Sequence, residues 1–178
     1  LAVGGVITIA NGSSSAPAIA FASDTDTGIL RGGTNNLAFA AGGATRTYID
    51  ANTHLATNTA GTSNLALGVN AGNSIISGGN YNVVVGDEAG TALTQGDESV
   101  AVGFEALMTA STGSENVGIG YRALKLTTGN SNVAVGKNAL AANSSASNNT
   151  AVGTSALTAN TTGSSNTAVG MDAMLANT

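Results

Sequence analysis

The chain contains one histidine and ten carboxylates, which are the side chains that could carry acid–base or nucleophilic chemistry. A Ser-His-Asp triad could be built only around His54, and this residue lies in a polar stretch without a nucleophile motif. A glycosidase would need two carboxylates ~5–10 Å apart across a sugar. The acidic residues of the middle region are spaced along the chain, and we expect them to confer solubility: Asp87, Glu88, Asp97, Glu98 and Glu105. We therefore predict no catalytic residue and no enzymatic activity.

The sequence gives equally little support for a metal or cofactor site. Asp24 and Asp26 could offer oxygen ligands to Ca²⁺, but the later acidic ligand of an EF-hand loop is missing, so we expect a turn in which a side chain bonds to the backbone. The many glycines lack the Gly-Lys-Ser/Thr of a phosphate-binding loop. The chain has no cysteine and therefore no disulfide or thiolate site. We predict no metal and no cofactor.

Three aromatic residues of the middle region could bind a ligand by stacking: Tyr81, Phe104 and Tyr121. Phe104 and Tyr121 each follow a glycine of the repeat described below, so we expect them to lie one above the other on the surface. Aromatic faces stack on sugars, which makes this pair the candidate receptor contact. The alternative is that the two rings fill a groove between chains.

The dominant feature of the chain is a five-residue motif that occurs seven times, with variations, between Asn64 and Met174. Its typical form is Asn-Val-Ala-Val-Gly. The glycines that end it, 16 to 18 residues apart, are Gly68, Gly86, Gly103, Gly120, Gly136, Gly153 and Gly170. An alanine stands three positions after each glycine. A fixed period of this length is typical of a solenoid with one coil per repeat.

Each motif alternates with a period of two, which predicts a short β-strand. The residue before the glycine is always aliphatic, and the middle residue is usually alanine, so the face of the middle residue must meet either the opposite wall of the coil or a neighbouring chain. The recurring glycine indicates a backbone angle that side chains disfavour. Asparagine opens six of the seven strands, and we expect these side chains to form an amide ladder. The Ala-Leu pair that follows four of the corners, at 106–107, 123–124, 139–140 and 156–157, could be a second strand or a helical turn.

Residues 1–60 lack the repeat and contain short β-like runs separated by turn residues. We expect an antiparallel meander with strands at Val3–Ala10, Ala18–Ala22, Gly28–Arg31, Leu37–Ala40 and Thr45–Ile49. Residues 61–178 form the predicted parallel β-solenoid of about seven 17-residue coils. The fold class is therefore all-β.

Composition restricts both the core and the partners. Only 3% of the residues are aromatic, so the core must be thin or shared between chains, and we predict a homotrimer around a common apolar axis. Five Lys and Arg residues and a net charge of −5 argue against nucleic acid and against an anionic membrane surface. No apolar run approaches the ~20 residues of a membrane-spanning helix, so we expect no membrane insertion.

The repeat, written Asn-Thr-Ala-Val-Gly-x-x-Ala-Leu and separated by Asn-Thr-Thr-Gly-Ser-Ser at 160–165, resembles repeats in tail fibres and tailspikes of tailed bacteriophages. It is also similar to the head repeats of trimeric autotransporter adhesins, which are parallel β-rolls. The stretch 16–28 resembles segments that precede such arrays in phage fibres. The resemblance implies a trimeric, elongated virion appendage for host attachment, with other tail proteins and a host surface glycan or protein as partners. It transfers no catalytic residue.

These observations leave one leading hypothesis and three alternatives. We expect a non-enzymatic fibre segment located in the virion. A bacterial surface adhesin or extracellular filament built on the same repeat is the alternative, and a secretion signal and a membrane anchor in the gene would favour it. An ice-binding solenoid would need a flat threonine face, but the strand threonines are only Thr150 and Thr167. A polysaccharide-degrading tailspike is the enzyme alternative.

Overall fold

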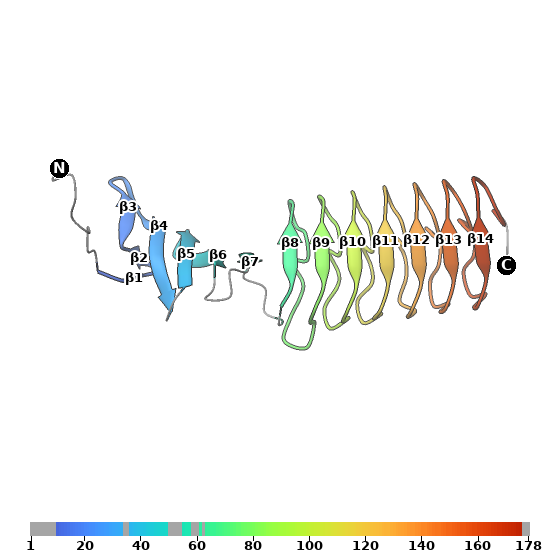
Figure 1. The fold of residues 1–178 in the computed structure, drawn as a ribbon, viewed down its shortest axis with the longest axis horizontal. Coiled ribbons are helices and arrows are strands. Elements are labelled where there is room, and N and C mark those ends of the chain that lie inside the picture. The colour runs from blue at the N-terminus through green and yellow to red at the C-terminus, as the bar shows by residue number, and fades with distance from the viewer. Residues whose placement is uncertain (1–9, 34–35, 50–54, 58–60, 62, 176–178) are drawn as a thin grey trace. The chain divides into compact units, whose positions relative to one another are not determined.

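The computed structural model describes residues 10–33, 36–49, 55–57, 61 and 63–175 of the 178-residue chain. The chain divides into two compact units, Leu1–Asn58 and Thr59–Thr178. All regular elements in the described residues are β-strands, fourteen in number (Figure 1). The predicted all-β class, with an antiparallel sheet followed by a parallel β-solenoid, is confirmed.

The first unit contains a five-stranded antiparallel sheet in the order β3-β4-β5-β6-β7. Its strands are β3 (Ile19–Phe21), β4 (Asp24–Gly33), β5 (Asn36–Ala41), β6 (Ala44–Ile49) and β7 (Leu55–Thr57). The strands β1 (Gly12–Ser13) and β2 (Ala16–Pro17) pair with each other as a separate hairpin. The predicted meander is thus present.

Two details of the first unit differ from the sequence-based expectation, and a third prediction lies almost entirely outside the described residues. The stretch 24–28, expected as a loop, is the beginning of β4: Asp24 and Gly28 pair with β3, and Gly28 also pairs with Ala40 of β5. The strand β7 follows His54 in the sequence, in the polar stretch where no strand was predicted. The run predicted at Val3–Ala10 lies outside the described residues apart from Ala10, which is in no regular element.

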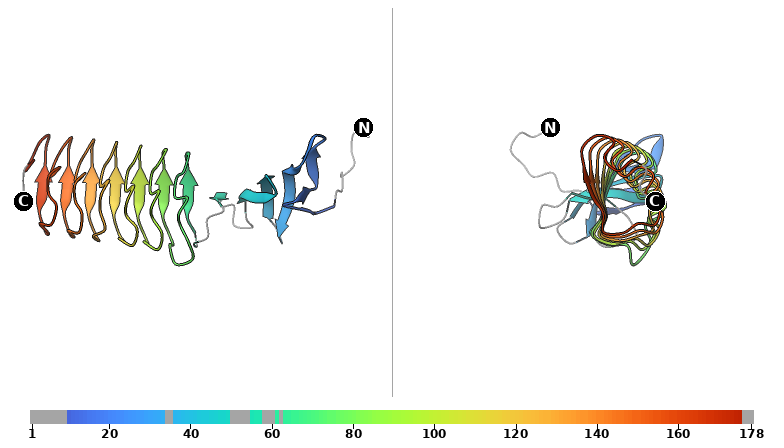
Figure 2. Two further views of the ribbon diagram at one scale, coloured as in Figure 1. Left: turned by 180° about the vertical axis from the view of Figure 1, so that it is seen from behind. Right: turned by 90° about the vertical axis from the view of Figure 1, so that its right-hand side faces the viewer.

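The second unit is a stack of coils, each of which contributes one three-residue strand to a parallel sheet (Figures 1 and 2). The strands are β8 (Leu65–Leu67), β9 (Val83–Val85), β10 (Val100–Val102), β11 (Val117–Ile119), β12 (Val133–Val135), β13 (Thr150–Val152) and β14 (Thr167–Val169). Their order in the sheet is their order in the chain, and each pairs with the next without a shift in register. From the first of these seven strands to the last, the solenoid makes about six complete turns.

The interior of the solenoid is a narrow column of small and medium aliphatic side chains. The middle residue of each strand points inward, and in β9 to β14 it is buried, from Val84 to Ala168. It faces the alanine that follows each corner glycine by three positions and the leucines beyond it, all in one buried cluster. The opposite wall of the same coil therefore meets the middle residue, which decides between the two alternatives that the sequence left open.

The corner glycines have the backbone angle that the sequence indicates. Gly68, Gly86, Gly103, Gly120, Gly136, Gly153 and Gly170 all have φ between +123° and +138°. A Cβ atom on Gly103 would lie 2.6 Å from the carbonyl oxygen of Gly120 in the next coil. The corner thus excludes any side chain for two reasons, backbone strain and direct overlap with the adjacent coil.

The Ala-Leu pair is neither a second strand nor a helical turn. It lies in a turn in which each leucine adopts φ near +50°: Leu107, Leu124, Leu140 and Leu157. This left-handed conformation is unusual for leucine. It directs four large side chains into the interior, where all four are fully buried.

The predicted asparagine ladder is present, and it bonds mainly to the backbone. The Asn116 Oδ1 atom accepts a hydrogen bond from the Asn132 backbone N–H of the next coil at 3.0 Å, and the Asn116 Nδ2 donates to the Gly129 carbonyl at 2.8 Å. Direct side-chain amide bonds join Asn132 to Asn116 and Asn166 to Asn149, both at 3.1 Å. Each of these buried side-chain amides therefore forms hydrogen bonds with the adjacent coil.

Candidate functional site: the outer faces of the solenoid

The outward face of the parallel sheet carries two columns of side chains, all aliphatic except Thr150 and Thr167. They belong to the first and third residues of each strand, and we call them the aliphatic stripe: Leu65, Val83, Val100, Val117, Val133, Thr150 and Thr167, and Leu67, Val85, Val102, Ile119, Val135, Val152 and Val169. Their side chains are half-buried or exposed, with Leu67 at 47% and Val169 at 70%. The stripe contains no charged residue.

A stripe of this length differs from the isolated surface hydrophobics that occur on most soluble proteins. In-register pairing places each side chain directly over its equivalent in the next coil, as in the pair Val100 and Val117. Because the strands are ~4.8 Å apart, neighbouring side chains are in contact and form a continuous surface. Chemically, this surface can bind another apolar surface.

A second surface feature lies just beyond the stripe, at the position after the corner glycine. Phe104 and Tyr121 lie one above the other, as the repeat register predicts, with ring centroids 5.7 Å apart and planes inclined by 16°. Both rings are about 40% exposed. The guanidinium of Arg122 lies 4.8 Å from the Tyr121 ring centre, at the distance of a cation–π contact.

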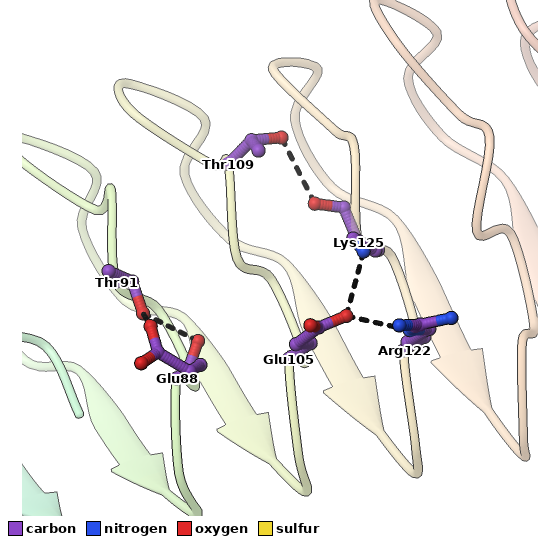
Figure 3. A network of polar contacts seen from close by, with 6 residues as sticks. All are labelled: Glu88, Thr91, Glu105, Thr109, Arg122 and Lys125. Carbon is purple, nitrogen blue, oxygen red and sulfur yellow. Dashed lines mark hydrogen bonds and ion pairs between the residues drawn. The ribbon is translucent and has the colours of Figure 1, made fainter. Parts of the chain in front are cut away.

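Beside this pair, Glu105 forms ion pairs with two cations of the next coil (Figure 3). Its Oε2 atom lies 2.6 Å from the Arg122 Nε and 2.7 Å from the Lys125 Nζ. The hydrogen bond from Lys125, and then that from Arg122, holds the pKa of Glu105 below its usual value, and the pKa of Arg122 is raised by Glu105. The sequence contained a signal for this network that we did not use: Glu105 and Arg122 occupy the same position in consecutive repeats.

Three of the other predicted acidic residues, Asp87, Glu88 and Asp97, bind neighbouring coils through their carboxylates. The Asp87 carboxylate accepts a hydrogen bond from the Val69 N–H at 3.0 Å, and the Asp97 carboxylate accepts one from the Asn80 N–H at 2.6 Å. The Glu88 carboxylate accepts from the Asn70 amide and lies within hydrogen-bonding distance of Thr91 (Figure 3). These carboxylates thus support coil stacking, a role beyond the solubility that we expected.

The candidates for metal and acid–base chemistry are placed as follows. Asp24 and Asp26 share a hydrogen bond at the start of β4, which lowers the pKa of Asp24 and raises that of Asp26. Within the described residues, no group of three or more His, Cys, Asp and Glu side chains is placed to hold a metal ion. His54 lies outside the described residues. Across the same part of the chain, no helix has the length and apolarity to span a bilayer.

Comparison with known proteins adds no relative to these observations. No protein-family model matches the chain, and neither a curated protein nor a solved structure is significantly similar to it. The aliphatic stripe and the aromatic pair are therefore the features of the chain that bear on its function.

Proposed function

We propose that the protein is a structural, non-enzymatic segment of a phage tail fibre that assembles as a homotrimer and supports or mediates attachment to a host cell surface. The observation that carries the proposal is the aliphatic stripe, which runs over all seven strands of a solenoid whose own interior is already filled. An uncharged surface of this extent is typical of a surface that another chain covers.

Three copies of the same chain fit this surface better than an unrelated partner does. The stripe repeats similar side chains in register from coil to coil, so three stripes can pack around one axis with equivalent contacts in every layer. Each complete coil buries one leucine or isoleucine beside several alanines, which is a thin core, and sharing an apolar axis adds buried area at each coil. The assembly would be an extended shaft, the form that the repeat resemblance also implies.

In this role the solenoid catalyses no reaction, and its outer corners face the host surface. Phe104 and Tyr121 are the proposed receptor contacts, because they are the stacked and exposed aromatic pair of the described solenoid. Other tail proteins would bind at the ends of the shaft. The protein would lie in the virion, outside the host cell.

Native mass spectrometry of the whole chain with the variant Val117→Asp tests the assembly. Val117 is in the centre of the stripe, and a charge buried at a shared axis costs several kcal/mol. We expect three times the 17.1 kDa chain mass for the parent protein and dissociation of the variant. The matched control is Thr154→Asp, an exposed position whose equivalent in the β9 coil is already Asp87, and it should remain trimeric. A monomeric parent protein would contradict the proposal.

Binding of the labelled protein to bacterial cells tests attachment. We expect saturable binding to a subset of strains and at least about tenfold weaker binding of the double variant Phe104→Ala/Tyr121→Ala, since aromatic stacking contributes ~1–3 kcal/mol per contact. Unchanged binding of that variant would exclude the aromatic pair as the contact. Degradation of capsular polysaccharide by the parent protein would contradict the non-enzymatic role.

A further inference from the structure

The Lys and Arg residues of the second unit lie in two consecutive coils, next to the aromatic pair. They are Arg122 and Lys125 of the β11 coil and Lys137 of the β12 coil. The carboxylates lie in other coils, since no Asp or Glu occurs from Asn116 to Met171. In a chain with a net charge of −5, these two coils are therefore a local region of positive charge.

Backbone hydrogen bonds just beyond the corner glycines place Phe104, Tyr121 and Lys137 in one row. The Arg122 N–H donates to the Phe104 carbonyl at 2.9 Å, and the Asn138 N–H donates to the Tyr121 carbonyl at 2.9 Å. These bonds keep the coils in register at the position that follows each corner, and all three side chains of the row are exposed. Lys137 therefore continues the row of the two stacked rings, one coil or ~4.8 Å further along the solenoid.

The cations beside this row have capacity for a further anion. The Lys137 side chain forms no hydrogen bond or ion pair with the described residues. Glu105 faces both Arg122 and Lys125 with the single atom Oε2, so one carboxylate serves two cations. Arg122 bonds to it through Nε, and Figure 3 shows the other end of the guanidinium directed away from Glu105.

This arrangement fits a sugar polymer that carries carboxylates. The C–H face of a sugar ring packs on an aromatic ring, and a carboxylate accepts charge-assisted hydrogen bonds from guanidinium and ammonium groups. The cations follow the row and do not surround one point, which suits an extended chain with one charge per sugar. A nucleic acid also combines rings with charges, but it needs more phosphate-binding cations than the three that are present.

We propose that the row of Phe104, Tyr121 and Lys137, with Arg122 beside it, binds an acidic polysaccharide. A sugar ring stacks on the aromatic pair, and carboxylates of the polymer bind Arg122 and Lys137. The inference rests on the proposed function, because it gives the chemical class of the receptor at the same aromatic pair. Asp87 holds the equivalent position in the β9 coil, so the acidic groups of the polymer lie towards the β12 coil.

Surface plasmon resonance of the whole chain on immobilised polygalacturonate tests the site, with the fully methyl-esterified polymer as a neutral ligand of the same backbone. We expect at least about tenfold tighter binding to the acid form. This preference should weaken as NaCl is added, because salt screens exposed charges.

Variants of the cations locate the binding. Lys137→Gln should bind polygalacturonate about threefold more weakly, and the double variant Arg122→Gln/Lys137→Gln about tenfold more weakly, as expected for exposed ion pairs. Lys137 has no contact whose loss would disturb the fold, so the single variant remains informative if the double variant is unstable. The matched control is Arg46→Gln, which removes the same charge from an exposed position of the first unit and should bind as the parent protein does.

Three results would overturn the acidic-polysaccharide site: equal binding of the acid and ester polymers, unchanged binding of Lys137→Gln, or tighter binding of a single-stranded oligonucleotide of matched charge. Cell binding separates this site from the proposed attachment. Cell binding that is lost in Phe104→Ala/Tyr121→Ala but retained in Lys137→Gln would indicate a neutral receptor, which overturns the inference and leaves attachment standing. Preference for polygalacturonate without binding to any bacterial strain would contradict attachment and support the site.

Discussion

The interior of the solenoid is filled in two different ways along its length. In the β8 and β9 coils, the fourth residue after the corner glycine is itself glycine, and the seventh is Ile75 or Leu93. In the β10 to β13 coils the large and the small residue exchange positions. The fourth residue is always leucine, and the seventh is smaller or polar: Ala110, Thr127, Asn143 and Asn160.

Both groups of coils fill the interior with one large side chain. What differs is whether the fourth or the seventh residue after the corner glycine provides it. A Cβ atom on Gly72 would lie 2.8 Å from the Ile75 Cδ1, because the isoleucine already occupies that space. At Gly90 the nearest atom is the Val84 Cγ1 at 3.1 Å, and Val84 is the one valine at a middle strand position. Protein interiors are close-packed, so a gain at one position requires a loss at another.

The two groups of coils also differ in backbone strain. A leucine in the left-handed conformation costs roughly 1–2 kcal/mol. Complete burial of its side chain contributes about 1.5–3 kcal/mol, which is enough to offset that cost. The β8 and β9 coils avoid the strain with Gly72 and Gly90, both near φ +55°, and bury a side chain three positions later.

The largest expected effect is the removal of one of the left-handed leucines. Leu124→Ala should lower the free energy of unfolding by about 3 kcal/mol, because it leaves a cavity in the β11 coil that Thr127 is too small to fill. Denaturant unfolding at fixed protein concentration measures the change. The control Lys137→Ala, on the surface of the next coil, should alter the free energy by less than about 0.5 kcal/mol. Equal effects for both variants would contradict the importance of leucine at this position.

Exchanging the large and the small residue within the β9 coil tests whether the two positions share one internal volume. Gly90→Leu should cost about 2 kcal/mol alone, because its side chain would overlap Val84 and the Leu93 Cβ. Leu93→Ala should cost about 3 kcal/mol alone, as a cavity. The double variant reproduces the pattern of the β10 coil, and its cost should fall below the sum of the two by more than about 1 kcal/mol. Strict additivity in the double-mutant cycle would show that the two positions do not share one volume.

The polar seventh residues form a second buried ladder that the β8 and β9 coils lack. The Asn143 Nδ2 donates to Thr127 at 3.1 Å, and the Asn143 Oδ1 accepts from Asn160 at 3.1 Å. Asn143→Ala should therefore cost about 1–2 kcal/mol, since it leaves buried partners unsatisfied. Thermal unfolding compares it with Asn73→Ala, an exposed asparagine of the β8 coil that should tolerate the change. An unaffected Asn143→Ala would mean that water replaces the lost bonds.

The smallest effect concerns the charges, which join the β10 and β11 coils through Glu105. Because the folded pKa of Glu105 is lowered, its ionised form stabilises the fold at pH values above the usual glutamate pKa, and this contribution disappears as the pH falls through the folded pKa. Glu105→Gln should therefore lower the unfolding temperature slightly at neutral pH, with the two proteins converging in acid. The control is Glu115→Gln. A difference that persists in strong acid would exclude this ion pair as its cause.

The sequence was sufficient to predict the parallel solenoid, because the glycine period and the strand alternation depend only on local geometry and on contacts between identical neighbours. It also predicted that Phe104 would stack on Tyr121, since in-register strands place equivalent residues together. The turn with left-handed Leu107 and its equivalents could not be predicted, because intrinsic preference excludes leucine there and only burial reverses it. The second ladder, at Asn143 and Asn160, was missed for a related reason, since asparagine in a loop is expected to face solvent.

The register of the coils has a consequence for how the gene can change. The first six corner glycines each pack on the glycine of the next coil, and Asn132 and Asn149 each bond to the asparagine one repeat before them. An unequal exchange between two copies of the coding repeat would remove or add one whole winding and leave the junction chemically unchanged. This holds for exchanges among the β10 to β13 windings. Joining the β9 winding directly to a later one would bring differently filled interiors together, so the solenoid should vary in length more readily among its β10 to β13 windings.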